Sequence, residues 1–372
     1  MKATYDREGL LAAVQLVSSV VPARTPKAIL QNVKVTNAAD KSVLTATDLD
    51  SVGVRLEVRG VQVEEPGDAL LPMARLLSIL RECNDQELRL ETDANSSFIR
   101  GEHSEFELPG DDPVQYPDVP RFDGDDYHQI QSSVLKTLID RTIFAAATEH
   151  ARFALTGVLW EVNAQKVRLV ATDGRRLAVA DGIGVMHGKH DSGGQTPVVP
   201  TKVMQLLERN LLDPEEPIFA SLRANEVLFK SGKAEIYGRL VEGRYPPYKD
   251  VFPKKTSFKT KLVVGPFLSA VRQAAILTDE ESRGVDFSFA KGKLTLKAKV
   301  ADKGRAKVEM AVDFEGKGAD VTFDPKFVID MLRVLDEDAE LSLELGDATS
   351  AALFKAGDDY SYIVMPLARE GR

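Results

Sequence analysis

The sequence predicts an α+β fold in which one module of helices and strands occurs three times along the chain. The tripeptide Ala-Thr-Asp occurs at residues 46–48 and again at 171–173, a spacing of 125 residues, and each copy runs into an alternating apolar pattern. Pro72, Pro200 and Pro325 each precede a helical apolar pattern, at spacings of 128 and 125 residues. A repeat of this length indicates a duplicated structural unit rather than a short motif.

Each module is expected to begin with an amphipathic helix. Apolar residues recur at the i, i+3, i+4, i+7 spacing of one helix face in the windows 6–21, 132–148 and 265–278. Short segments in which apolar and polar residues alternate come next and predict antiparallel strands. These segments are 29–37 and 42–58 in the first module, 157–163 and 166–180 in the second, and 285–300 and 306–314 in the third.

A second helix is expected in each module, in the windows 72–83, 200–212 and 325–336. Proline is tolerated at a helix start because its missing N–H would have no partner there in any case. Further strands close the modules at 87–110, 218–241 and 339–367. The segments 111–126 and 242–257 are rich in proline and charge, as linkers often are. We therefore predict three domains, at 1–125, 126–255 and 256–372.

Composition predicts a protein of the reducing cytoplasm. The chain of 372 residues has one cysteine, Cys83, which excludes an internal disulfide bond. Its first residues do not resemble a signal peptide, and no run reaches the roughly 20 apolar residues of a membrane helix. The net charge is −9, divided as −9, +3 and −3 among the three modules. An acidic total therefore leaves room for a local positive surface.

Five stretches occur in an order that resembles a known family. They are "REGLL…VS…R…ILQNV" from Arg7, "ATDGRRLA" from Ala171, "EGRYPPYKDVFP" from Glu242, "AAILTDEESRGV" from Ala274 and "YIVMPL" from Tyr362. The chain resembles the bacterial DNA polymerase III beta subunits, the DNA sliding clamps, over its whole length. The resemblance implies three two-helix, eight-strand clamp domains and a head-to-tail homodimer that forms a ring around duplex DNA. It also implies a processivity factor that binds the replicative DNA polymerase, the clamp loader and other proteins with a clamp-binding motif.

Basic side chains facing such a hole would offset phosphate repulsion without reading sequence. The six helix windows hold ten basic and seven acidic side chains, a modest excess of positive charge. Arg24, Arg152 and Arg283 match family positions near DNA. The expected DNA-binding residues are Arg24, Arg75, Lys136, Arg141, Arg152, Lys202, Arg272 and Arg283.

The resemblance further implies a groove that holds a short partner peptide. Its expected residues are Leu155, Thr172, Gly174, Arg175, Arg176, Leu177, Pro246, Val251, Thr349, Ala351, Ile363, Met365, Pro366 and Leu367. Arg176 is expected to lay its stem along the cleft with its charged head in solvent. Methionine suits a site that accepts several partners, because its side chain is flexible and polarizable. The first copy of the turn, "ATDLDS", lacks Gly-Arg-Arg and is not expected to form such a site. The alternative for Ile363 is a buried last strand.

The ring interface is expected at Phe106 and Leu108 on one side and at Ile276 and Leu277 on the other. Its flanking charges depart from the family pattern. Where the family often has an acidic run, this chain has "ADKGRAKVEM", with Lys303, Arg305 and Lys307. Ala368, with "REGR" after it, stands where a basic residue is frequent. These departures keep a rival interpretation open, a clamp-like paralogue that binds peptides as a scaffold but does not close on DNA.

No catalytic or metal site is expected. The turn at Asp173 could hold an anion or act as a base, but a strand follows it where a phosphate cradle needs a helix. A repeat-built hydrolase that uses Asp173 is the rival from another class. The five histidines are scattered, and no Cys or carboxylate set joins His187 and His190 in "HGKH". We therefore expect no cofactor, no metal, no membrane partner and no turnover.

Overall fold

The computed structural model describes residues 1–93, 96–148, 153–190, 196–278, 284–300, 303–314, 317–347 and 349–368. The chain divides into two compact units. The first comprises Met1–Lys136, Val162–Gln165 and Gly184–Val241, and the second comprises Thr137–Glu161, Lys166–Ile183 and Glu242–Arg372. Both units take residues from the predicted second module. The division into domains 1–125, 126–255 and 256–372 therefore stays a prediction, and each unit is described by itself.

The first unit contains helices α1 (Arg7–Ser18), α2 (Met73–Glu82) and α4 (Thr201–Asn210), and α3 (Ser132–Asp140) begins in it. Its strands up to the first linker are β1 (Lys2–Asp6), β2 (Asn32–Asn37), β3 (Ser42–Thr47), β4 (Val52–Val58), β5 (Val61–Glu65), β6 (Gly67–Pro72), β7 (Glu87–Thr92), β8 (Ser96–Arg100) and β9 (Glu105–Pro109). Those after it are β10 (Tyr127–Gln131), β14 (Val185–His187), β15 (Val198–Pro200), β16 (Pro217–Leu222), β17 (Glu226–Ser231) and β18 (Ala234–Arg239).

Two antiparallel sheets form the framework of the first unit. One has the strand order β5-β1-β7-β8-β9, and the other has the order β14-β10-β16-β17-β18-β4-β3-β2-β6. In the longer sheet, β18 pairs with β4 and places Ile236 opposite Val54. This ladder joins the first predicted module to the second by main-chain hydrogen bonds, so a linker is not their only connection.

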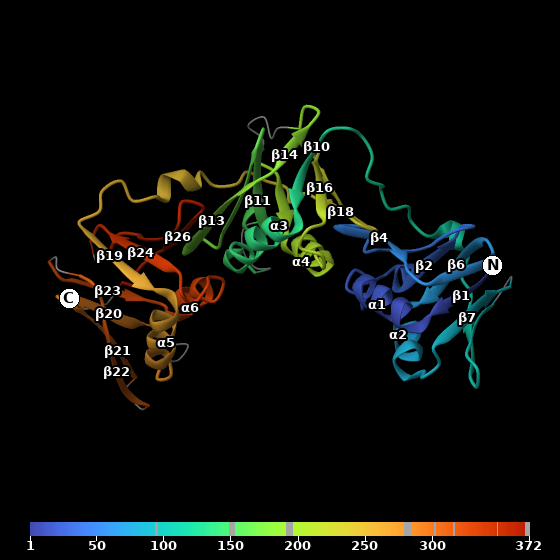
Figure 1. Cartoon of the computed structure of the whole chain (residues 1–372), viewed down its shortest axis with the longest axis horizontal. Coiled ribbons are helices and arrows are strands. Elements are labelled where there is room, and N and C mark those ends of the chain that lie inside the picture. Colours follow the sequence, from blue (N-terminus) through green and yellow to red (C-terminus); the bar gives the residue numbers. More distant parts are fainter. Residues whose placement is uncertain are drawn as a thin grey trace. The chain divides into compact units, whose positions relative to one another are not determined.

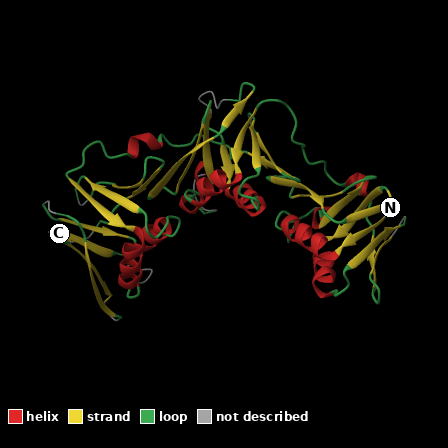
Figure 2. Cartoon of the chain, in the orientation of Figure 1, coloured by secondary structure: helices red, strands yellow, loops and turns green. Residues whose placement is uncertain are grey.

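Helices of the first unit bury their apolar faces against these sheets. Helices α1 and α2 pack against each other, and α1 also packs on β3 and β4 (Figure 1). Val14 and Val17 of α1 and Leu80 of α2 are fully buried. Burying each such side chain contributes about 1.5–3 kcal/mol relative to leaving it exposed. Within the unit the helices gather on one side of the strands (Figure 2).

The second unit contains α5 (Val264–Ala275), α6 (Pro325–Leu332) and the end of α3. Its strands are β11 (Gly157–Asn163), β12 (Lys166–Thr172), β13 (Arg176–Ile183), β19 (Phe258–Val263), β20 (Val285–Ala290), β21 (Lys293–Val300), β22 (Gly304–Ala311), β23 (Ala319–Phe323), β24 (Glu340–Leu345), β25 (Ala352–Ala356) and β26 (Tyr360–Val364). Short 3₁₀ turns, η3 (Ile143–Ala145), η4 (Phe153–Leu155) and η5 (Tyr248–Val251), lie between them.

The strands of the second unit form one sheet ordered β11-β12-β13-β26-β25-β24-β19 and another ordered β22-β21-β20-β23. Strand β13 pairs with β26 and places Leu177 opposite Ile363. This ladder joins the second predicted module to the third, as β18 and β4 join the first to the second. Trp160 of β11 is completely buried in this unit.

The prolines mark the predicted helix starts. Pro72 and Pro200 each occupy the position before the first helical residue, at the end of a strand. Pro325 is the first residue of α6, and the side chain of Asp324 caps that helix by accepting the Lys326 N–H at 2.9 Å. A fixed proline φ and a side-chain cap both favour the first helical turn.

Each helix ends before its sequence window does, and the difference is largest in α3 and α6. Helix α3 ends at Asp140 instead of reaching 148, and α6 ends at Leu332 instead of 336. Just after α3 the hydroxyl of Thr142 donates to the Leu138 carbonyl at 2.7 Å, and the chain then continues into η3. Such side-chain bonds compete with helix propagation. Among the described residues, no helix is both long enough and apolar enough to cross a membrane.

The two Ala-Thr-Asp copies form closely similar turns. In the first, the Thr47 hydroxyl donates to the Val52 carbonyl and accepts the Leu49 N–H, at 2.9 Å each. In the second, the Thr172 hydroxyl donates to the Arg176 carbonyl at 2.6 Å and accepts the Gly174 N–H at 3.0 Å. Leu49 has φ +73° and Gly174 has φ +88°. The shared pattern of bonds and left-handed backbone supports the predicted duplication.

Candidate functional site

The second unit contains a cavity of about 670 Å³ between β13, the end of β26 and the segment 244–251. The predicted groove residues that line it are Leu155, Thr172, Gly174, Arg175, Arg176, Leu177, Pro246, Val251, Ile363 and Met365. Five lining residues were missed by the sequence prediction, namely Ala154, Arg244, Tyr245, Pro247 and Tyr248. The predicted Thr349, Ala351, Pro366 and Leu367 do not line it.

The floor of the cavity is the turn between β12 and β13. The Asp173 carboxylate accepts the N–H groups of Arg175 and Arg176 at 2.9 and 3.0 Å. Gly174 supplies the left-handed residue that this turn requires, and the space where its side chain would stand is open. A larger residue there would therefore meet backbone strain rather than a steric clash. These bonds also occupy Asp173, which makes it poorly suited to act as a base.

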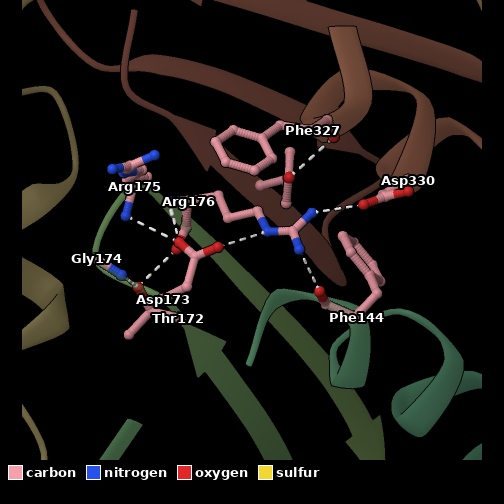
Figure 3. A network of polar contacts seen from close by, with 9 residues as sticks. Phe144, Thr172, Asp173, Gly174, Arg175, Arg176, Phe327 and Asp330 are labelled. Carbon is pink, nitrogen blue, oxygen red and sulfur yellow. Dashed lines mark hydrogen bonds and ion pairs between the residues drawn. The ribbon is translucent and has the colours of Figure 1, made fainter. Parts of the chain in front are cut away.

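Arg176 does not reach solvent as the sequence predicted, since its side chain is only 8 % exposed. Its guanidinium donates to Asp173 at 2.9 Å, to Asp330 of α6 at 2.8 Å and to the Phe144 carbonyl at 2.6 Å (Figure 3). It also lies over the Phe327 and Phe144 rings, 4.6 and 5.5 Å from their centroids. The expectation of an exposed head is wrong because these partners satisfy the charge inside the unit.

The electrostatics of the network keep Arg176 charged. Burial alone would lower the pKa of Arg176, but the neighbouring Tyr362, Asp330 and Asp173 together raise it above its usual value. The Tyr362 hydroxyl donates to the Phe327 carbonyl at 2.9 Å. This bond fixes Phe327, whose ring lies over the Arg176 guanidinium. Arg176 therefore acts as a rigid support beneath the groove and connects β13 to α6 and η3.

The wall opposite the turn comes from the proline-rich segment that the sequence marked as a linker. Tyr245 and Tyr248 are buried and anchor it to the sheet. The Tyr245 hydroxyl donates to the Val170 carbonyl at 3.2 Å, and the Tyr248 hydroxyl donates to Glu161 at 2.8 Å. Burial, and then the bond to Glu161, raise the pKa of Tyr248 to about 12. These two anchors leave Pro246 and Val251 facing the cavity.

The third side is the end of β26 and the residues after it. Ile363 is 2 % exposed and belongs to the strand, so both predicted interpretations hold for it, as a buried strand residue and as part of the wall. The Met365 N–H donates to the Arg175 carbonyl at 2.9 Å, while 40 % of Met365 remains exposed. The Leu367 N–H donates to the Thr322 carbonyl at 2.8 Å, and Leu367 is not among the residues that line the cavity.

Thr349 and Ala351 belong to a separate loop. The Thr349 N–H and hydroxyl both donate to Asp347 at 2.8 Å, and these bonds lower the pKa of Asp347 to about 2. Thr349 is thus held by bonds within its own loop, and neither Thr349 nor Ala351 lines the cavity. The groove itself offers apolar walls from Leu177, Ile363 and Val251 and exposed cations from Arg175 and Arg244. Such a surface can bind an apolar peptide with an acidic flank.

The predicted DNA-binding residues differ in their surroundings. Arg24, Arg75 and Arg272 are exposed, and no ion pair holds them within the described part of the chain. Lys136 lies 3.8 Å from Glu208, and Lys202 lies 2.8 Å from Asp48. Arg141 is paired with Asp359 at 2.9 Å and lies over the Tyr360 ring at 5.4 Å. Arg152 and Arg283 lie outside the described residues.

The predicted interface residues lie near the open ends of two sheets. Phe106 and Leu108 are on β9, the outer strand of the five-stranded sheet, half-buried and 7 % exposed respectively. Ile276, just after α5, is 76 % exposed, and Leu277 is half-buried. Leu108 is therefore mainly a core residue in this chain, whereas Ile276 is available for contact.

The histidine pair is also accounted for by packing. His187 stacks on Tyr127 with ring centroids 4.6 Å apart. His190 is buried, and its Nδ1 lies 2.6 Å from Nδ1 of His128. In the part of the chain that the structure describes, no three His, Cys, Asp or Glu side chains gather as metal ligands would.

Comparisons with known proteins match this chain to one protein family over nearly its whole length. Sequence models of the DNA polymerase III beta subunit match residues 1–120 (N-terminal domain), 129–247 (central domain) and 249–368 (C-terminal domain). The beta sliding clamp of Pseudomonas putida is 33 % identical over 377 residues, which cover 99 % of this chain and 100 % of the relative. The sliding clamp of Bacillus subtilis superposes with a TM-score of 0.92 at 25 % identity, with 100 % of each chain covered. The DNA polymerase III subunit beta of Pseudomonas aeruginosa gives 0.89 at 28 % identity, with 99 % of this chain and 100 % of that one covered.

Proposed function

The chain belongs to the family of DNA polymerase III beta subunits, the bacterial sliding clamps, and from this premise we propose how it works. Two copies join head to tail and enclose duplex DNA, so that topology rather than tight contact retains them. The groove in the second unit holds a short peptide of the replicative polymerase, of the clamp loader or of another partner. The protein acts in the cytoplasm and catalyses no reaction.

The successive match of three family domains carries this proposal. It supports a division into three domains at 1–125, 126–255 and 256–372, with strand ladders such as β18–β4 and β13–β26 crossing the boundaries. The full-length relatives named as sliding clamps do not favour the alternative, a scaffold that never closes on DNA. A hydrolase based on Asp173 is not supported either, because that carboxylate holds a turn and Arg176.

The groove suits one class of occupant, an extended peptide with apolar anchors. Its walls are apolar side chains on rigid strands and a tyrosine-anchored segment, and Met365 gives one edge that can adapt to different side chains. Arg175 and Arg244 at the rim favour acidic residues beside the anchors. The residues that we assign to peptide binding are those that line the cavity, with Arg176 as their support.

The first prediction concerns the interaction with DNA. Replacing the exposed Arg24, Arg75 and Arg272 together by alanine should weaken DNA binding, because each arginine that neutralises a phosphate releases counterions. The slope of log K against log salt should fall by about one for each arginine that faces a phosphate. Binding to duplex DNA at several salt concentrations measures this slope. Replacing Lys254 and Lys255 together by alanine is the control, since both are exposed and neither belongs to the predicted DNA-binding set. An unchanged slope in the triple variant would remove these residues from the DNA surface.

The second prediction tests encirclement itself. After loading by the clamp loader, the protein should remain on nicked circular DNA and should leave linear DNA by sliding off its ends. Blocking both ends of the linear DNA with bound protein should restore retention, which gel filtration of the DNA-bound fraction measures. Equal loss from open and blocked linear DNA would contradict enclosure, whatever the groove binds.

A further inference from the structure

A chain of polar contacts crosses one face of the sheet in the second unit and ends at the groove wall. Arg168 of β12 lies directly opposite Asp181 of β13 in the ladder. The guanidinium donates to both carboxylate oxygens of Asp181, from Nε at 2.5 Å and from Nη2 at 2.7 Å. Such a two-pronged pair fixes the plane of the guanidinium as well as its position. The Asp181 N–H donates to the Asp359 carbonyl at 2.8 Å, so the pair is also tied to the turn before β26.

The remaining nitrogen of this guanidinium is directed to Glu161 at the end of β11. Nη1 of Arg168 lies 3.9 Å from Oε2 of Glu161, and the same Oε2 accepts the Tyr248 hydroxyl at 2.8 Å. The other oxygen, Oε1, lies 3.4 Å from Nζ of Lys249. Burial, and then the bond to Glu161, raise the pKa of Tyr248, whereas Arg168 acts in the opposite direction, so the guanidinium also acts on that hydroxyl. Glu161 thus connects Arg168 to the groove wall.

The two tyrosines that anchor the wall have different acceptors. Tyr245 donates to the main-chain carbonyl of Val170, whose position is set by the strand. Tyr248 donates to the side chain of Glu161, which is 29 % exposed and could adopt other rotamers. An acceptor of this kind positions its partner only when a further contact fixes it. The Tyr248 N–H donates to the Pro246 carbonyl at 2.7 Å, so a shift of Tyr248 would carry the cavity-lining Pro246 with it.

We propose that Arg168 is a positioning residue for the peptide groove. It is not among the residues that line the cavity, and it acts through Glu161 and Tyr248 on the wall, residues 246–251. The contact with Asp181 holds Arg168 in place, so the wall stands in its binding position before a peptide arrives. Preformed sites bind more tightly because less ordering is required on binding. The inference rests on the proposed function and adds the residues that hold the groove open.

The first test needs no peptide. In the full chain, Arg168→Ala and Tyr248→Phe should each release the wall, which hydrogen–deuterium exchange measures at the amides of Tyr248 and Asp250. These N–H groups donate to the carbonyls of Pro246 and Pro247 at 2.7 and 3.1 Å. Both amides should exchange at least ~10-fold faster in each variant, because local opening limits their exchange. Unchanged exchange in Arg168→Ala would overturn the inference, whatever the peptide affinity.

The second test is a double-mutant cycle on peptide affinity, measured by fluorescence polarisation with a clamp-binding peptide. Each of Arg168→Ala and Tyr248→Phe should weaken binding roughly 3- to 10-fold, as expected for the loss of one hydrogen bond. The double variant should bind no more weakly than the weaker single variant, because both substitutions break the same connection. A merely structural role would instead give two independent losses, and a double variant whose loss is the product of the two would overturn the inference.

Variants of Glu161 separate the hydrogen bond from general packing. Glu161→Gln should bind the peptide within ~3-fold of the original chain, since the amide oxygen can still accept the Tyr248 hydroxyl. Glu161→Ala should reproduce the loss seen in Tyr248→Phe. Equal losses in the Gln and Ala variants would overturn the connection through this hydrogen bond.

The matched control is Arg89→Ala in the first unit. Arg89 also lies on a strand and also contacts two carboxylates, Glu64 at 2.9 Å and Glu91 at 3.0 Å, with a similar exposure. This variant should change neither the exchange of the wall nor the peptide affinity, and thermal unfolding checks that every variant is folded. An original chain that binds no such peptide would contradict the proposed groove, while the exchange measurement would still decide whether Arg168 holds the wall.

Discussion

Replacing Arg176 by alanine is expected to lower the free energy of unfolding by about 3 kcal/mol, because removing one partner of a buried ion pair leaves the others without compensation. Asp330 and Asp173 would lose their cation, the Phe144 carbonyl would lose its donor, and the Phe327 ring would lose its guanidinium. Denaturant unfolding of the full chain, followed by far-ultraviolet circular dichroism, measures the change.

The same substitution should weaken peptide binding at least ~10-fold at a temperature where the variant is still folded, since about 1.4 kcal/mol corresponds to a factor of ten. The reason is positional, because Arg176 holds the Thr172–Gly174 turn against α6. Arg244→Ala is the matched control, since Arg244 lines the same cavity but is exposed. It should change peptide affinity without changing stability. Equal stability of the two variants would show that the buried network contributes little.

Arg176→Lys should fail to rescue the site. The guanidinium makes three directed hydrogen bonds and lies over Phe327, and an ammonium group cannot reproduce that fork. Asp330→Asn combined with Arg176→Ala completes a double-mutant cycle, in which the coupling energy reports the pair itself. A coupling energy near zero would mean that the turn is held by its own local bonds.

Truncation after Val364 is expected to abolish stimulation of the polymerase while β26 stays intact. The deletion removes Met365, which lines the groove and whose N–H donates to the Arg175 carbonyl. A methionine side chain that a bound peptide covers contributes about 1.5–3 kcal/mol, which corresponds to roughly 10- to 100-fold in affinity. Fluorescence polarisation with a clamp-binding peptide measures the affinity, and primer extension on a long template measures processivity.

The matched control is truncation after Leu367, which keeps the hydrogen bonds of Met365 and Leu367 described above. It should behave as the full chain does in both assays. The chain truncated after Val364 should still dimerise and should unfold within about 1–3 kcal/mol of the full chain, the net contribution of the Met365–Arg175 and Leu367–Thr322 hydrogen bonds that the truncation removes. Normal polymerase stimulation after truncation at Val364 would exclude this cavity as the docking site.

Local signals in the sequence predicted the repeated elements because they depend on neighbours in the chain. The helix starts at Pro72, Pro200 and Pro325 follow from the fixed φ of proline. The helix ends were less predictable, since the hydroxyl bond of Thr142 that accompanies the end of α3 is invisible to apolar periodicity. The Thr172 and Gly174 turn was also accessible, because its bonds span only a few residues.

The groove was only partly predictable, because its remaining parts depend on residues distant in sequence. Asp330 lies 154 residues after Arg176, so no local pattern could show that this arginine is buried. Tyr245 and Tyr248 stand in a segment whose composition is typical of a linker, and their role depends on Val170 and Glu161, which belong to other strands. The alternation of tyrosine and proline in "RYPPY" was the one available signal, since buried tyrosines need partners for their hydroxyls.

The paired turns at Leu49 and Gly174 have a bearing on how such a docking site can arise. In both copies the threonine and aspartate side chains bond to the backbone of the loop itself, so the loop can keep its shape with different side chains at the positions between them. Selection can then change the side chains of one turn for peptide recognition, while the other turn continues only to connect two strands. Duplication of the module within one chain thus provides one turn that can acquire a binding role and a second turn that keeps its structural role.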